Sequence, residues 1–489
     1  MSQQPPHGAT PYGPGQPPPY GGQFGPPSVG TPPPGGGGGG RRGRRLAVVL
    51  VSALAVALAG VAAFVWLPGD DTTEADNRDQ PDPADVTTPA EATLAWDLPA
   101  PGVSAEDRAV TAVGTWLVGD TVVRLMDSGL VAYGLADGEE RWGLPLERSS
   151  GHADCLASRN VDDGRVAVGQ GRDCEVMTVV DVEAGEEVTS FPVDLPIPSG
   201  ADEAPALLGD TLAIGAGQRY GGAGYRVSDG AELWRHNAVN DPCVDVSYQV
   251  LAGTLVALHL CEDGAAGGQV RGLAEDGTEL WAWAYEAEYE DEAFDVRAVV
   301  SAEPLVVLAE VGDDREERLF VVHDNHTGIS HPLDYDEDRH VSPCFWRFCD
   351  AALVADGQLH LRGGTGTAVG FDLTTGQEVY EAEPVEGHEE IRPFGTLDDL
   401  VLGYQPAFGQ QAGLVVTIDP ATAEVAALRW LDPRTSSRET ALVEGGDSQP
   451  ATGWHEVRPL WDTDSRTFLL SREIFQAGAG PVPALLAYR

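Results

Sequence analysis

The chain has 489 residues, which is more than most single hydrophobic cores organise unless the core is built from repeats. It carries 77 acidic residues against 30 basic ones, and every basic residue is Arg, so the formal net charge is -47. A surface of this sign repels phosphates, which excludes nucleic acid as an expected partner.

Residues 1–45 are rich in Pro and Gly, with runs such as PPP at 17–19 and 32–34. This composition buries too little apolar surface to fold, so we expect a disordered, proline-rich tail. Two interpretations of the Pro runs remain open. They are either ligands for an aromatic groove on a cytoplasmic partner or flexible chain without a receptor.

Residues 46–67, LAVVLVSALAVALAGVAAFVWL, contain no charge and match the ~20 residues that cross a bilayer as one helix. Arginines at 41–45 precede the run, and Asp70 and Asp71 follow it. The positive-inside rule then predicts a single-pass anchor in the cell membrane, with the N-terminus in the cytoplasm and the rest outside. A cleaved export signal is the alternative, but the long preceding region favours the anchor.

Residues 68–91 are acidic and interrupted by Pro, which predicts an extended extracellular stalk. The six cysteines all follow it and form three neighbouring pairs: Cys155 and Cys174, Cys243 and Cys261, Cys344 and Cys349. An oxidising exterior favours disulfides within these pairs. A zinc site is the alternative, but no CxxC occurs.

A short phrase recurs along residues 92–489. Its turn glycines lie roughly 45–51 residues apart, which is the length of one blade of a β-propeller: Gly138, Gly185, Gly230, Gly277, Gly328 and Gly376. Each unit has an apolar strand, a bend, a second strand and a tight turn with Asp, Thr or Gly. An outer strand with an aromatic residue closes the unit.

These aromatic residues are expected to dock each blade on the next, because one ring buries about 150–250 Å². The positions are Trp142, Trp234, Trp281, Tyr380 and Trp430. The chain ends on a unit without an outer strand, and residues 92–102 supply one, with Trp96 matching Trp142. The first strand is therefore expected to complete the last blade and close the ring. Counting this composite blade predicts an all-β fold of eight four-stranded blades. The weak unit at 419–430 leaves seven as the alternative.

The segments FDLTTGQEVY (371–380), HDNHTG (323–328) and LADGEERWGLP (135–145) resemble the PQQ-binding-like β-propeller repeat, over about residues 92–489. That family contains quinoprotein dehydrogenases and non-enzymatic scaffolds. If the resemblance extended to the quinone site of those dehydrogenases, it would imply a disulfide of adjacent cysteines, a Trp below the quinone and a calcium ion held by protein side chains. Here the nearest spacing is CFWRFC (344–349), so no catalytic, cofactor or metal residue carries over and PQQ is not expected.

Other candidate motifs have simpler interpretations. His323 to His326 aligns with the turn of the repeat, so we expect a turn there and no metal. The acidic segments 285–295 and 333–340 are either calcium sites or solvated loops. The glycine-rich bend 217–226 lacks the ending of a phosphate-binding loop.

Together these features predict a membrane-anchored extracellular propeller. It would act as a binding, scaffold or sensory module for a protein, a wall polymer or a small ligand. The alternative is an extracellular quinoprotein-like dehydrogenase, or another enzyme with its site in the central channel.

Overall fold

A computed structural model describes residues 90–489 with gaps at 101–108, 112–113, 127, 148–156, 172–173, 196–203, 238, 240, 262–267, 286–287, 290–291, 325, 345–346, 348, 350, 410, 445–456 and 477–481. The predicted tail, the membrane span at 46–67 and nearly all of the stalk lie outside the described residues. Within the described part, no helix is long and apolar enough to cross a membrane.

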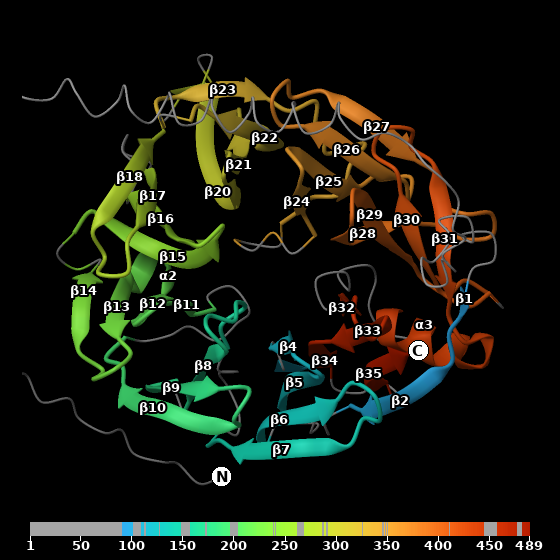
Figure 1. The fold of residues 1–489 in the computed structure, drawn as a ribbon. Helices are drawn as coiled ribbons and strands as arrows, with labels where there is room; N and C mark the ends of the chain where they lie inside the picture. The colour runs from blue at the N-terminus through green and yellow to red at the C-terminus, as the bar shows by residue number, and fades with distance from the viewer. Residues whose placement is uncertain are drawn as a thin grey trace, which may run out of the picture. The chain divides into compact units, whose positions relative to one another are not determined.

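The described strands form eight blades around a common centre, so the prediction of an eight-bladed β-propeller is confirmed and the seven-bladed alternative is wrong (Figure 1). Within a blade, successive strands run antiparallel from the centre to the rim. Blade 1 contains β4 (Thr115–Val118), β5 (Thr121–Met126), β6 (Gly129–Gly134) and β7 (Glu140–Pro145). Blade 2 contains β8 (Arg165–Gln170), β9 (Val176–Asp181) and β10 (Glu186–Pro192), with Ala157 bridged to Val168 on the inner side.

The next three blades follow the same order. Blade 3 contains β11 (Ala206–Leu208), β12 (Thr211–Gly215), the short helix α2 (Gly217–Tyr220), β13 (Gly222–Arg226) and β14 (Glu232–His236). Blade 4 contains β15 (Cys243–Leu251), β16 (Thr254–Cys261), β17 (Gln269–Leu273) and β18 (Glu279–Ala284). Blade 5 contains β19 (Glu288–Tyr289), β20 (Glu292–Ala302), β21 (Leu305–Val311), β22 (Glu316–Val322) and β23 (Ile329–Pro332).

The last three blades include the closure of the ring. Blade 6 contains β24 (Leu353–Ala355), β25 (Gln358–Arg362), β26 (Ala368–Asp372) and β27 (Glu378–Ala382). Blade 7 contains β28 (Arg392–Leu397), β29 (Leu400–Gln405), β30 (Leu414–Ile418) and β31 (Val425–Trp430), with β1 (Ala90–Glu91) parallel to β31. Blade 8 contains β32 (Val457–Asp462), β33 (Thr467–Arg472), β35 (Pro483–Tyr488) and β2 (Leu94–Pro99).

Four further elements lie beside blade 8. The 3-10 helix η2 (Pro433–Thr435) and the helix α3 (Ser436–Glu444) connect blade 7 to it, and β3 (Ala109–Thr111) pairs with β34 (Ile474–Gln476). Ala90 and Glu91, which the sequence placed in the stalk, lie in β1.

The middle strands of the blades are buried on both faces, because neighbouring blades cover them. All five residues of β12 and all six of β33 are buried, whereas the rim strand β10 is mostly exposed. This pattern explains why the middle strands are continuous apolar runs instead of alternating ones.

The two ends of the propeller meet in blade 8. β2 pairs antiparallel with β35, and Trp96 lies opposite Ala487. The Trp96 indole Nε1 donates a hydrogen bond to the Leu135 carbonyl oxygen of blade 1 at 3.0 Å. Gly138, with φ +68°, lies under the same ring, and a Cβ there would be 2.5 Å from it. Trp96 therefore connects blade 8 to blade 1.

The same contact recurs around part of the ring, between an outer-strand aromatic residue and the turn of the next blade. The Trp142 ring lies over Gly185, Phe191 over Gly230 and Trp234 over Gly277. Between blades 4 and 5, Trp281 stacks on His326 with 4.1 Å between ring centroids. Tyr380 and Trp430 lie on β27 and β31, close to His360 and His388 respectively.

Candidate functional site

One face of the propeller, which we call the entry face, gathers polar side chains. It is the face where innermost strands begin and second strands end, as in blade 4, where Cys243 lies opposite Cys261. Because the strand order repeats, the start of β28 at Arg392 and that of β32 at Val457 lie on the same face. Side chains far apart in sequence are therefore brought together there.

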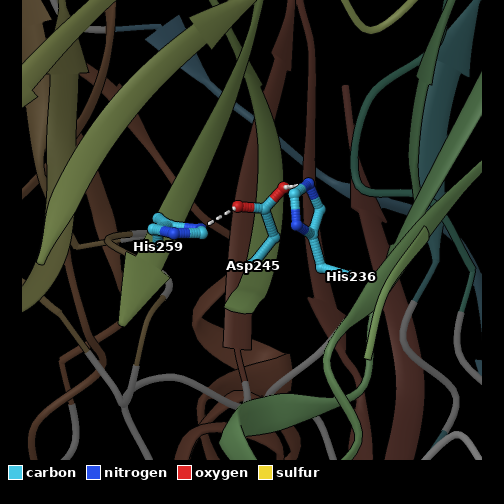
Figure 2. A group of neighbouring side chains, drawn as sticks. All are labelled: His236, Asp245 and His259. Atoms are coloured by element: carbon cyan, nitrogen blue, oxygen red, sulfur yellow. Dashed lines mark hydrogen bonds and ion pairs between the residues drawn. The ribbon is translucent and has the colours of Figure 1, made fainter. Parts of the chain in front are cut away.

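A buried carboxylate, Asp245, forms the centre of one polar cluster on the entry face (Figure 2). It lies on β15, opposite His259 of β16, while His236 ends β14 of the preceding blade. The His259 Nδ1 lies 2.7 Å from Asp245 Oδ1, and the His236 Nε2 lies 3.4 Å from Asp245 Oδ2. The cluster thus joins blade 3 to blade 4.

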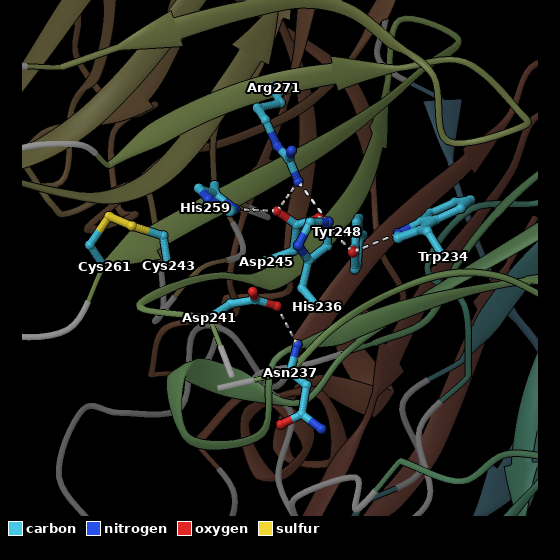
Figure 3. A network of polar contacts seen from close by, with 10 residues as sticks. All are labelled: Trp234, His236, Asn237, Asp241, Cys243, Asp245, Tyr248, His259, Cys261 and Arg271. Atoms are coloured by element: carbon cyan, nitrogen blue, oxygen red, sulfur yellow. Dashed lines mark hydrogen bonds and ion pairs between the residues drawn. A yellow bond between two sulfur atoms is a disulfide. The ribbon is translucent and has the colours of Figure 1, made fainter. Parts of the chain in front are cut away.

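Two more donors complete the cluster (Figure 3). The Tyr248 hydroxyl donates to Asp245 Oδ2 at 2.7 Å and itself accepts from the Trp234 indole at 3.0 Å. Arg271 of β17 forms an ion pair with Asp245. Burial opposes ionisation of Asp245, but the hydrogen bond from His259 and the charge of Arg271 outweigh it, so its pKa lies below the ordinary value.

The ligand atoms of His236, Asp245 and His259 lie within 4.8 Å of one another, which is compatible with a metal ion. The position of Arg271 argues against one. Its guanidinium contacts Asp245 and also lies 3.3 Å from His236 Nε2. A cation already neutralises the carboxylate, and a divalent ion would have to displace it against mutual repulsion. We therefore interpret the cluster as a structural link between two blades.

The Cys243–Cys261 disulfide lies beside this cluster (Figure 3). A second disulfide, Cys344–Cys349, lies between blades 5 and 6 along the chain. Both pairings confirm the prediction. Cys174 is also disulfide-bonded, whereas its predicted partner Cys155 lies outside the described residues.

The Cys344–Cys349 loop reaches the inner strands of blades 4 and 5. The Gln249 amide of β15 donates a hydrogen bond to the Arg347 carbonyl oxygen. The Cys349 Sγ lies 3.5 Å from the Val299 carbonyl oxygen of β20. Arg347 and Cys349 are therefore packed against the inner strands of blades 4 and 5.

Next to the loop lies a cavity of about 300 Å³, which we call the inner cavity. The starts of β24, β28 and β32 surround it, so three blades contribute to its wall. Its charged side chains are Arg362, Arg392, Arg458 and Glu473, and its apolar wall includes Leu353 and Phe394. This volume and mixture are typical of a site for a small molecule.

The inner cavity is unusually basic for so acidic a chain. Glu390 forms ion pairs with Arg362 at 3.1 Å and with Arg392 at 2.9 Å. Burial lowers the pKa of Arg392 to about 9, although Glu390 opposes this shift. Burial also raises the pKa of Glu390, against the effect of both arginines. Arg392 keeps its charge at neutral pH.

The other motifs singled out in the sequence form turns, strands or a short helix. His326 lies in the turn after β22, where its backbone N–H donates to the His323 carbonyl oxygen at 2.7 Å. Asp336 accepts backbone hydrogen bonds from Asp338, Arg339 and His340, so this part of the acidic segment 333–340 is a folded turn. The segment 217–226 forms α2 and β13.

The inner cavity does not fit the quinone site of the dehydrogenases. Glu473 is the one carboxylate among its described lining residues, and none of them is Asn, Asp or Gln. The described lining therefore cannot build a calcium cage. The Cys344 and Cys349 pair is separated by 5 positions and is not an adjacent pair.

Several solved structures resemble the fold. The computationally designed Ika8 protein has 13% identity, covers 82% of this chain and 99% of its own, and has a TM-score of 0.47. BamB from Moraxella catarrhalis has 10% identity, with coverages of 79% and 98% and a TM-score of 0.44. The quinohemoprotein alcohol dehydrogenase ADHIIG from Pseudomonas putida HK5 has 13% identity, with coverages of 82% and 76% and a TM-score of 0.48.

No curated protein matches the chain in sequence. A family model does match, over residues 126–329, and its description is outer membrane protein assembly factor BamB. The matched segment runs from the end of β5 to the start of β23, so it includes the turn and outer strand of blades 1 to 4. The match covers less than half of the chain, and within residues 126–329 it agrees with the PQQ-like repeat expected from the sequence.

Proposed function

We propose that the chain is a membrane-anchored binding module, whose propeller lies outside the cell and takes a small ligand in the inner cavity. The single observation that carries this proposal is the cavity of about 300 Å³ on the entry face, with arginines and a buried carboxylate in an otherwise apolar wall. A rigid closed ring suits such a role, because it holds the lining residues of three blades in fixed positions. A wall polymer or a protein partner would bind over the same face.

The membrane topology in this proposal comes from the sequence. The uncharged run at 46–67, the arginines before it and the acidic stalk after it support an anchor with the propeller outside. The disulfides agree with an oxidising exterior. Protease treatment of intact cells tests the topology. We expect the propeller to be released and an N-terminal epitope to stay protected. Protection of both parts contradicts it.

The ligand proposal is tested by filling the cavity. Ala352 lines it, and Ala352→Trp would place an indole in the space. Leu280→Trp on the rim strand β18 is the matched control, because Leu280 is 60% exposed. Thermal-shift measurements use the full chain in detergent with a panel of amino acids, sugar acids and nucleotides. At least one compound is expected to stabilise the parent and the control but not Ala352→Trp. Equal shifts in all three proteins contradict binding in the cavity.

A further inference from the structure

Two oppositely charged side chains of blade 8 line the inner cavity without forming an ion pair with each other. Glu473 is only 3% exposed, and its Oε1 has no hydrogen-bond partner among the described residues. The guanidinium of Arg458 donates to the Thr115 carbonyl oxygen at 3.3 Å and forms no ion pair with a described carboxylate. The cavity therefore offers one acceptor and one cation to a ligand.

The strand register places both groups at the same edge of blade 8. Arg458 pairs with Ser471 between β32 and β33, and Glu473 follows β33 by one residue. A buried carboxylate oxygen without a donor is costly, because burial has removed the water that would satisfy it. A ligand that brings a donor to Glu473 recovers this lost interaction.

The neighbouring charges already have other partners. Glu390 holds Arg362 and Arg392 in ion pairs. Arg124 attracts Glu473 through space, but its guanidinium donates to the Ser471 hydroxyl at 2.6 Å and to the Ala484 carbonyl oxygen at 2.8 Å. Arg458 and Glu473 are thus the two groups best placed to select a ligand.

We propose that the inner cavity binds an α-amino acid with an apolar side chain. Its carboxylate would meet Arg458, its ammonium group Glu473, and its side chain the wall of Leu353 and Phe394. A zwitterion supplies both missing charges at once, whereas a simple anion leaves Glu473 without a donor. This inference rests on the proposed function, because it names the ligand class of that same cavity.

The ligand side is tested by titrating the full chain in detergent calorimetrically with L-leucine and three analogues. These are 3-methylbutylamine without the carboxylate, 4-methylpentanoate without the amine, and 2-hydroxy-4-methylpentanoate with a neutral donor. Each analogue is expected to bind about tenfold or more weakly than leucine. If the hydroxy acid or 4-methylpentanoate binds as tightly as leucine, the proposal of a zwitterionic ligand is wrong.

The protein side is tested with Glu473→Gln and Arg458→Gln. Glu473→Gln is expected to weaken the binding of leucine about tenfold but to leave the affinity for 4-methylpentanoate unchanged. Arg458→Gln is expected to weaken the binding of leucine but to leave the affinity for 3-methylbutylamine unchanged. Arg226→Gln is the control, since Arg226 pairs with the exposed Asp229 in blade 3. Unaltered leucine binding in both cavity variants overturns the assignment, and intact thermal melts of the variants exclude misfolding.

The two proposals fail differently. If a sugar acid or a nucleotide stabilises the parent, and Ala352→Trp abolishes that effect, the binding module stands and the amino-acid assignment falls. If Ala352→Trp leaves every observed ligand shift unchanged, binding in the cavity itself is refuted.

Discussion

At the scale of single residues, Glu439 of α3 is a fully buried carboxylate outside the inner cavity. It accepts hydrogen bonds from the Tyr404 hydroxyl and from the backbone N–H groups of Ala407 at 3.0 Å and Gly413 at 3.1 Å. Burial nevertheless dominates and raises its pKa to about 7, whereas the unfolded chain titrates near 4.5. Glu439 therefore links α3 to blade 7, and its protonation state makes the stability of this link depend on pH.

Glu439 is predicted to make the protein less stable as the pH rises from about 4.5 to about 7. In this window the folded chain holds a proton that the unfolded chain has lost, and above it both states are ionised. Glu439→Gln removes this titration, so the decrease in the free energy of unfolding across this pH window should be smaller by roughly 3 kcal/mol. Urea unfolding at a series of pH values measures it. Glu444→Gln, an exposed neighbour on α3, is the control, and parallel profiles for parent and Glu439→Gln contradict the prediction.

The residues of the candidate site could not be predicted individually from the sequence. Arg362, Arg392 and Glu473 lie on three different blades, and no local motif marks any of them. His236, Asp245 and His259 likewise come together only through the pairing of β15 with β16 and the end of β14. Periodicity reports on neighbours along the chain, whereas these sites depend on which strand ends share a face.

At the scale of elements, the contact of a turn glycine with an aromatic ring has two separable components. Gly277 has φ +80°, and a Cβ there would overlap the Trp234 ring; Gly253 has φ +75° and open space around it. Gly253→Ala should cost about 1 kcal/mol from backbone strain alone. Gly277→Ala should cost roughly 1–3 kcal/mol more, because the Trp234 ring must move. Chemical denaturation measures both, and equal losses would show that the ring is not packed against the turn.

The two described disulfides are expected to contribute unequally, because they close loops of different length. Cys243 and Cys261 are 18 positions apart, and Cys344 and Cys349 are 5 apart. In the chain-entropy model the first contributes about 3 kcal/mol and the second about 2 kcal/mol. Paired Cys→Ser variants compared in thermal unfolding without reductant measure the difference. A greater loss from the shorter loop contradicts this order and indicates that the loop supports the ring centre in other ways.

The outer parts of the blades were more predictable from sequence than the innermost strands. A turn glycine next to an aromatic strand, as at Gly138 and Trp142, is a local signal that one short segment contains in full. The innermost strands β11 and β24 have three residues each and no alternating pattern. The sequence also shows no sign of α3, a nine-residue helix whose burial depends on Glu439 and on two apolar side chains. Tertiary packing decides such short elements.

At the scale of the whole molecule, closure of the ring depends on β2, because it brings the beginning of the propeller into the last blade as its outer strand. Its Trp96 is 8% exposed and packs in one cluster with Leu469 and Leu485 of blade 8. The same side chain bonds to Leu135 of blade 1. If β2 detaches when this Trp96 contact is lost, the outer edge of β35 loses its neighbouring strand. An unpaired strand edge opens readily.

Trp96→Ala is therefore predicted to open the ring locally, in addition to lowering its overall stability by about 3–5 kcal/mol. Trp142→Ala is the matched control, because Trp142 makes the corresponding contact between blades 1 and 2 without joining the chain ends. Amide hydrogen exchange separates the two effects. Under native conditions, exchange across Pro483–Tyr488 should accelerate about tenfold or more in Trp96→Ala and much less in Trp142→Ala. If β35 stays as protected in Trp96→Ala as in the parent, the packing of blades 8 and 1 holds the ring closed, and closure does not depend on β2.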